Sequence, residues 1–168
     1  MLNYFFSYLS VDYSFLNVFK YITFRTGVAI FTSLSLVLIL GGPFINYLKS
    51  SKHFDQPIRN DGPISHIIKK AGTPTFGGVL IIFAAILSSV LWADIKNIYV
   101  LICLFSILSF SLIGFFDDYL KIKKENSKGI KAIYKFLLQI IFGLMIVYLI
   151  NISTAEDIRD ILHLPFYK

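Results

Sequence analysis

The sequence predicts an all-α protein, a polytopic membrane bundle of about four transmembrane helices. Three observations support this class: the composition, the lengths of the uncharged segments, and the placement of the lysines. Of the 168 residues, 56% are hydrophobic and only 15% are charged, whereas soluble domains carry roughly 25% charged residues. The mean hydropathy of +0.70 agrees with a membrane protein.

The first helical element expected is interfacial rather than spanning. Residues 1–20 are rich in Tyr and Phe, which suit a membrane–water boundary. The stretch lacks the basic start and small-residue cleavage site of a signal peptide. We therefore expect an interfacial segment at residues 1–20 that precedes the first transmembrane helix.

Four windows without a charged residue follow, each about 20 residues long or slightly longer, as a helix needs to cross ~30 Å of hydrocarbon. The windows are Thr26–Leu48, Ala71–Ala93, Asn97–Phe116 and Phe136–Ala155. We predict transmembrane helices near residues 22–47, 73–94, 97–117 and 132–153, all within one membrane domain of residues 1–168.

The orientation follows from the basic residues. Eleven of the 16 Lys and Arg residues lie in two segments, residues 49–70 and 121–135, which connect the first helix to the second and the third to the fourth. By the positive-inside rule these connections are cytoplasmic, so both termini are extracytoplasmic. Because topology explains the net charge of +6, the sequence gives no reason to expect a nucleic-acid partner.

The start of the second helix has the features of a phosphate site. We expect Thr73 to cap this helix and Pro74 to occupy its first position, where no amide donor is needed. A helix start attracts anions, and Lys70 and Thr75 would add a charge and a hydroxyl. Gly77-Gly78 would permit close approach of another backbone or a ligand. The plainer interpretation is a membrane boundary, a helix cap and helix packing.

The third window ends in SLIGFFDDYLKIKK, where an apolar run meets two adjacent carboxylates. Asp117 and Asp118 point about 100° apart on a helix, so one can bind a cation or hold a proton while the other addresses a neighbouring helix. Lys121 lies within helical reach of either one. Carboxylates beside lysines suit phosphoryl chemistry with Mg²⁺. The alternative is a solvated, salt-bridged helix end.

Five lysines after the pair have the spacing of one helical face, although the Ser127–Gly129 segment predicts a break before the last two. Most of them are expected to be a generic positive-inside loop, and one or two could hold a diphosphate. The five are Lys121, Lys124, Lys128, Lys131 and Lys135.

Taken together, RNDGPISHIIKKAGTPTFGG, GFFDDYLKIKKENSKG and the dipeptide Tyr134-Lys135 closely resemble the phospho-N-acetylmuramoyl-pentapeptide-transferase family. This family belongs to the polyprenyl-phosphate N-acetylhexosamine-1-phosphate transferases. NVFKYITFR at Asn17–Arg25 resembles the family's N-terminal segment, so the resemblance spans essentially the whole chain. Phe76 stands where Met is usual in the family's TPTMGG motif.

The resemblance implies a Mg²⁺-dependent transferase of peptidoglycan synthesis, and hence of cell wall biogenesis, cell shape and cell division. Such enzymes transfer phospho-MurNAc-pentapeptide from its UDP-linked form to undecaprenyl phosphate, giving lipid I and UMP. The expected location is the bacterial inner (plasma) membrane, with the active site on its cytoplasmic face.

The resemblance also implies roles for individual residues. Asp117 would contact the lipid phosphate as proton acceptor or positioning group, and Asp118 would be its partner, shaping the site or the metal environment. Substrate binding would fall to Lys70 and Thr75 beside the diphosphate and uridine, and to the positive charges of Lys121 and Lys135. Asp117 is a candidate metal ligand, but the main ligand is expected in the family's second half. Direct attack by the lipid phosphate and a covalent aspartyl intermediate both stay open.

Family members are longer than this chain, and their second half carries an Asn- and Asp-rich motif and a His-rich loop that do not occur here. We therefore expect the N-terminal portion of such a transferase, inactive alone unless a second polypeptide completes it. A homodimer is also compatible with the sequence. Two alternatives stay open: a related transferase that uses UDP-GlcNAc, and a non-catalytic, truncated membrane protein.

Overall fold

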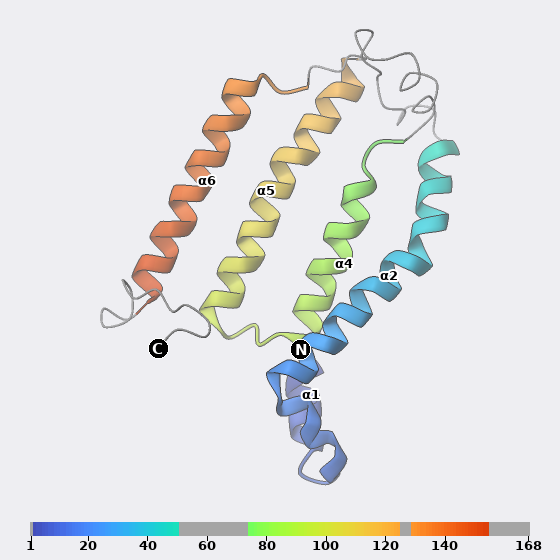
Figure 1. Ribbon diagram of the computed structural model, residues 1–168, viewed down its shortest axis with the longest axis vertical. Helices are drawn as coiled ribbons and strands as arrows, with labels where there is room; N and C mark the ends of the chain where they lie inside the picture. Colours follow the sequence, from blue (N-terminus) through green and yellow to red (C-terminus); the bar gives the residue numbers. More distant parts are fainter. Residues whose placement is uncertain (1, 51–73, 125–128, 155–168) are drawn as a thin grey trace, which may run out of the picture.

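The computed structural model describes residues 2–50, 74–124 and 129–154, and every element assigned there is a helix. The prediction of an all-α membrane protein is confirmed. A short helix and a 3-10 helix come first, followed by four longer helices (Figure 1). The elements are α1 (Leu2–Leu9), η1 (Ser14–Lys20), α2 (Ile22–Ser50), α4 (Gly77–Trp92), α5 (Ile98–Lys123) and α6 (Ala132–Ser153).

Three of the four longer helices, α2, α5 and α6, are long and apolar enough to cross a membrane. The fourth, α4, is apolar but has 16 residues, so it extends over only about 24 Å. The second predicted span began at residue 73, whereas α4 begins at Gly77. Pro74 therefore does not occupy the first helical position.

The late start of α4 has a local cause. Phe76 takes the N-cap position with φ 70° and ψ 8°, a left-handed conformation that a right-handed helix cannot contain. The expected cap, Thr73, lies outside the described residues. The backbone at Phe76 thus fixes the position at which the second helix starts.

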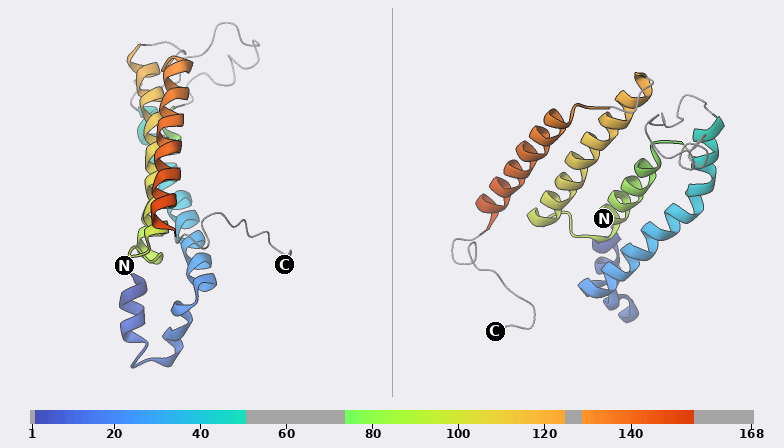
Figure 2. Two further views of the ribbon diagram at one scale, coloured as in Figure 1. Left: turned by 90° about the vertical axis from the view of Figure 1, so that its left-hand side faces the viewer. Right: turned by 45° about the horizontal axis from the view of Figure 1, so that its top comes forward.

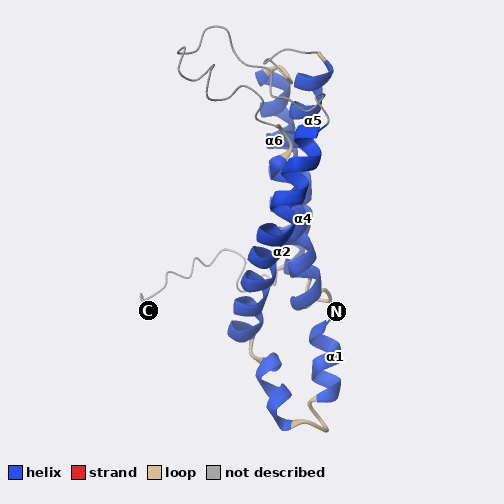
Figure 3. Ribbon diagram, turned by 90° about the vertical axis from the view of Figure 1, so that its right-hand side faces the viewer, coloured by secondary structure: helices blue, strands red, loops and turns tan. Residues whose placement is uncertain are grey.

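The longer helices α2, α4, α5 and α6 stand side by side in a row (Figure 1), and the row is a single layer when seen from its edge (Figures 2 and 3). Successive helices run in opposite directions. Helix α2 packs mainly on α4, and α5 mainly on α6, while α4 and α5 touch over a shorter stretch. Both faces of the row therefore present large apolar side chains outward, as expected for helices covered by lipid or by other helices.

Helix α2 is bent (Figure 1) and contains a proline, Pro43. Proline donates no backbone hydrogen bond, and its ring clashes with the carbonyl of the residue four positions earlier, here Ile39. The bend sets the direction in which the last turns of α2 reach the end of the row where α5 ends and α6 begins.

Helix α5 continues past the predicted end at residue 117 and stops at Lys123. Lys121 forms ion pairs with Asp117 and Asp118, which lie four and three positions earlier, and such pairs stabilise a helix surface. At the other end, the Asn97 side chain accepts a hydrogen bond of 2.9 Å from the N–H of Tyr99 and caps the helix. The aspartates consequently lie more than one turn inside α5.

The N-terminal elements α1 and η1 lie at the opposite end of the row from the aspartates (Figure 1). The rings of Phe6 and Phe19 stack with centroids 4.3 Å apart. Both rings also stack on Trp92, at 6.0 and 5.8 Å. This aromatic cluster attaches the first 20 residues to the end of α4.

A polar contact adds to this attachment, because the Tyr4 hydroxyl donates to the Asp94 carboxylate. That hydrogen bond, helped by the N–H of Lys96, lowers the pKa of Asp94 below its ordinary value. The lowered pKa means that ionised Asp94 stabilises the attachment of the N-terminal residues. This stabilisation is complete above the ordinary carboxyl pKa and is lost as the pH falls through the lowered pKa.

The two ends of the row should face opposite sides of the membrane. In a Cys103→Ser background, Lys96→Cys and Lys124→Cys place single thiols at exposed positions at the two ends. On intact cells, a membrane-impermeant maleimide should label Lys96→Cys and not Lys124→Cys, because lysine-rich connections stay cytoplasmic. Lysed cells provide the control in which both thiols react. Labelling of Lys124→Cys in intact cells would contradict the predicted orientation.

Candidate functional site

The site is centred on Asp117, whose carboxylate is buried where α5 meets the start of α6. Its residue is 6% exposed. Oδ2 lies 2.7 Å from Lys121 Nζ on the same helix and 3.4 Å from Lys135 Nζ on α6. Oδ1 accepts a hydrogen bond of 2.9 Å from the N–H of Ile130. Both oxygens are thus engaged, and the carboxylate joins α5 to the connection that leads into α6.

Asp118 lies on a different face of α5 and is more open. Its side chain is 35% exposed, and its Oδ1 is 3.0 Å from Lys121 Nζ. Lys121 therefore bridges the two carboxylates, and the predicted reach of Lys121 to either one is confirmed. Asp117 addresses the neighbouring helix while Asp118 faces outward, as the spacing of adjacent helical residues requires.

Gly129 is part of the same site, although the sequence indicated it only as a helix breaker. It is buried, with φ +55°. A Cβ on Gly129 would lie 2.5 Å from Asp117 Oδ1 and 3.0 Å from Lys121 Cε. Only glycine combines this backbone conformation with so close an approach. A glycine directly after a lysine-rich helix end was the one sequence signal, and it could not show which side chain the glycine contacts.

The break at Gly129 also determines how the lysines are arranged. Lys121 lies on α5 and Lys135 on α6, so the five lysines do not share the face of one continuous helix. The predicted break is confirmed. Further lysines lie exposed around the buried cluster and form no ion pair within the described part of the chain: Lys123, Lys124 and Lys131. This end of the row is therefore rich in cations, a charge distribution that attracts phosphates.

Thr75 lies at the same end of the row as the aspartates. The adjacent Phe76 ring is 5.1 Å from the ring of Phe115, two residues before Asp117. Lys70 lies outside the described residues. The prediction that Gly77 and Gly78 permit a close approach is not realised by the described residues, since a Cβ at either position would meet nothing within 4 Å.

A metal ion would find few ligands in the described segments. They contain no group of three or more His, Cys, Asp or Glu side chains that could hold one. Both oxygens of Asp117 are engaged, whereas the second oxygen of Asp118 has no partner among the described residues. Mg²⁺ is commonly held by one or two carboxylates together with substrate phosphates and water. Of the two aspartates at this site, Asp118 is therefore the one with room for such a cation.

Sequence comparison connects this geometry to known enzymes. No family model matches the chain. Over 158 residues, 94% of this chain, it is 45% identical to the phospho-N-acetylmuramoyl-pentapeptide-transferase of Pelagibacter ubique. The proteins of the same name from Rickettsia prowazekii and Rickettsia felis are 46% and 47% identical over 152 residues, 90% of this chain. Over at least 90% of its length, the chain is therefore similar to proteins that carry this one name.

The family resemblance inferred from the motifs is thereby confirmed. The chain spans 43% of the length of the Pelagibacter relative and 42% of the two Rickettsia relatives. The aligned region covers the Asp117 cluster, the start of α4 and the connection between α5 and α6.

Gly129→Ala should destabilise the protein by more than about 1 kcal/mol, because the new methyl group meets Asp117 and the backbone needs a positive φ. The matched control is Gly143→Ala in α6, where a Cβ would meet nothing within 4 Å. That control should be more stable by about 0.5–1 kcal/mol, since alanine favours a helix interior. Thermal unfolding in detergent measures both shifts, and faster hydrogen exchange of the Ile130 amide should accompany the Gly129 change alone. Equal shifts in the two variants would show that Gly129 does not fit closely against Asp117.

Proposed function

We propose that this chain is the part of a phospho-N-acetylmuramoyl-pentapeptide-transferase that handles the phosphates of its two substrates. In the reaction, an oxygen of undecaprenyl phosphate bonds to the sugar-linked phosphorus of UDP-MurNAc-pentapeptide. The bond from that phosphorus to the bridging oxygen breaks, UMP leaves, and lipid I forms. The observation that carries the proposal is the buried Asp117 carboxylate with lysines from two helices, in a chain similar to proteins of this name.

The arrangement supports a positioning role for Asp117. A phosphate monoester has a second pKa of about 6, so the lipid phosphate is largely deprotonated at pH 7 and needs no strong base. Asp117 holds the ammonium groups of Lys121 and Lys135 close together although they come from different helices. An incoming phosphate would accept hydrogen bonds from the same two ammonium groups.

The same contacts favour direct attack by the lipid phosphate over a covalent aspartyl intermediate. A nucleophilic Asp117 would need a free oxygen, but Oδ1 is held by the Ile130 N–H and Oδ2 by two lysines. Forming a bond to phosphorus would require these contacts to break first. Held in place, the carboxylate can instead orient both lysines throughout the reaction.

The remaining predicted residues would hold the nucleotide part. Thr75, at the start of α4, offers a hydroxyl at the same end as the aspartates, and we assign it with Lys70 to the UDP diphosphate. Asp118 faces outward and would hold Mg²⁺ together with substrate phosphates. Bound there, Mg²⁺ would neutralise charge on the diphosphate and on the leaving UMP.

The proposal also covers what the complete enzyme contains and where it resides. The chain covers 43% of the Pelagibacter relative, so we assign activity to this chain together with the rest of such a protein. The chain alone should form no lipid I. The complete enzyme would reside in the bacterial inner membrane with the Asp117 cluster on the cytoplasmic side, as the lysine distribution predicts.

Asp117→Asn should lower the rate of lipid I formation by about 100-fold or more, because the amide cannot hold two ammonium groups as the carboxylate does. The assay combines membranes containing this chain and the remaining part of the Pelagibacter relative with undecaprenyl phosphate, UDP-MurNAc-pentapeptide and Mg²⁺, and measures UMP release. The matched control is Asp94→Asn, the same chemical change at the opposite end of the row, which should leave the rate unchanged. Full activity of Asp117→Asn would refute the assignment and favour a non-catalytic role.

Asp118→Asn should affect the metal requirement rather than the maximum rate. We expect the Mg²⁺ concentration for half-maximal rate to rise by about tenfold or more, with most of the rate restored at saturating Mg²⁺. Asp117→Asn should stay slow at every Mg²⁺ concentration. The measurement is a Mg²⁺ titration of UMP release for both variants. An unchanged Mg²⁺ requirement for Asp118→Asn would remove Asp118 from the metal site.

A further inference from the structure

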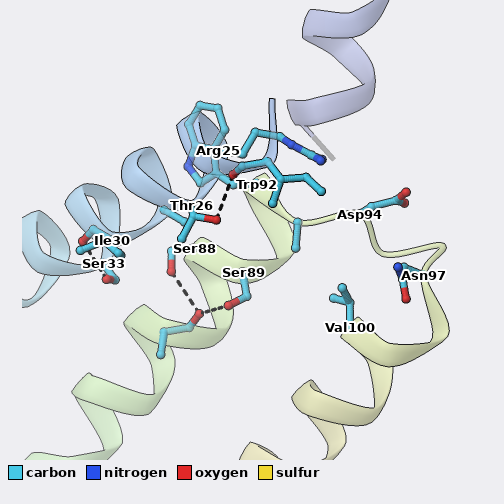
Figure 4. Close-up of a pocket in the computed structure, with 14 residues that line it drawn as sticks. Arg25, Thr26, Ile30, Ser33, Ser88, Ser89, Trp92, Asp94, Asn97 and Val100 are labelled. Carbon is cyan, nitrogen blue, oxygen red and sulfur yellow. Dashed lines mark hydrogen bonds between the residues drawn. The ribbon is translucent and has the colours of Figure 1, made fainter. Parts of the chain in front are cut away.

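A pocket of about 460 Å³ lies at the end of the row opposite to the Asp117 cluster, between α2, the end of α4 and the start of α5 (Figure 4). Arg25, Asp94 and Asn97 line one part of it, near the helix ends. Ala29, Ile30 and Ala85 line a second part. The pocket therefore combines a polar portion at the helix ends with an apolar portion between the helices.

Arg25 lines the pocket with a buried hydrogen-bond donor that lacks a partner. Its Nε atom is buried without a hydrogen-bond partner, and its guanidinium forms no ion pair with any described residue. The hydroxyl groups in the pocket already donate hydrogen bonds to backbone carbonyl groups of their own helices. They belong to Thr26, Ser33, Ser88 and Ser89. Arg25 is half-buried, and a partly desolvated guanidinium without an ion pair favours an anion beside it.

Nearby charges leave the polar portion positive. The Asp94 carboxylate accepts hydrogen bonds from the Tyr4 hydroxyl and the Lys96 N–H, and it forms no ion pair with Arg25. The Lys96 ammonium group, 5.0 Å from the centre of the Tyr4 ring, adds a second positive charge beside it. Arg25 and Asp94 thus line the polar portion, and Lys96 lies next to it in the chain, giving two cations and one anion. Guanidinium groups pair well with phosphate oxygens, because their N–H donors match the spacing of those oxygens.

The apolar portion indicates that the anion carries a hydrocarbon chain. Apart from Trp92, the α4 wall consists of small side chains at Ala85, Ser88 and Ser89, which keep a slot open beside α2. Beyond Arg25 the α2 lining continues as far as Ser33, about 12 Å along the helix axis. A soluble anion would fill only the polar portion, whereas an acyl chain can occupy the slot below it.

We infer that this pocket binds an anionic membrane phospholipid, with its phosphate at Arg25 and an acyl chain between α2 and α4. The inference does not rest on the transferase function, because the pocket and the Asp117 cluster share no residue and lie at opposite ends of the row. The lipid would fasten the start of α2 to the end of α4, where the aromatic cluster of α1 also attaches.

Trp92 provides the test, because it lines the pocket and is the single tryptophan of the chain. The 168-residue chain is reconstituted into vesicles of equimolar phosphatidylglycerol and phosphatidylcholine. In one sample only the phosphatidylglycerol carries brominated acyl chains, which quench tryptophan fluorescence, and in the other only the phosphatidylcholine does. The surface charge is thus the same in both. Phosphatidylglycerol should associate with Trp92 about fivefold more strongly, the effect of one charge-assisted contact.

Two variants locate the effect. Arg25→Gln should abolish the preference for phosphatidylglycerol, so that both lipids associate equally with Trp92. Lys20→Gln removes a nearby charge outside the pocket and should retain the preference. Ala85→Leu keeps Arg25 but fills the slot, and it should also abolish the preference. Circular dichroism establishes that each variant is folded. Soluble glycerol phosphate should not displace the lipid, and displacement would show a free-anion site in place of a lipid site.

Three results would overturn the inference. The first is equal quenching by the two brominated lipids in the unmodified chain. The second is an equal loss of preference in Arg25→Gln and Lys20→Gln, which would indicate general surface charge. The third is an unchanged preference in Ala85→Leu, which would place the lipid outside the pocket.

Discussion

The carboxylate of Asp117 is the constraint on which this end of the molecule depends. A charge removed from water costs several kcal/mol unless it is paired and hydrogen-bonded. Here two ammonium groups and one backbone N–H offset that cost, and each comes from a different part of the chain: α5, α6 and the connection between them. The position of α6 relative to α5, the close approach of Gly129 and the spacing of the two lysines all follow from satisfying one buried anion.

Much of this could be predicted from the sequence, because its signals are local. Uncharged windows of membrane-spanning length predict helices, and i+3 and i+4 spacing brings Lys121 to both aspartates. The start of α4 could not be predicted in this way. Thr73 and Pro74 have the residue types of a helix start, but the left-handed conformation of Phe76 delays the helix to Gly77. A backbone conformation unusual for a bulky residue depends on tertiary contacts, here with Phe115.

The two ends of the row also differ in how completely sequence reveals them. The Asp117 cluster lies within two consecutive motifs, so its members could be proposed from spacing and family resemblance. The pocket at Arg25 gathers residues from α2, α4 and α5 that are far apart in the chain and match no motif. In the sequence, Arg25 has the features of an ordinary residue at a membrane boundary. The structure shows that its Nε atom is buried without a hydrogen-bond partner. Long-range packing, which spacing does not encode, creates this site.

The short length of α4 affects the bilayer around it. A helix of 16 residues between longer neighbours is several ångströms too short for an average hydrocarbon layer. Hydrophobic mismatch of this kind draws the lipid headgroups inward beside the short helix. At the α4 start, next to Asp117, such thinning would bring the lipid headgroups closer to the buried carboxylate.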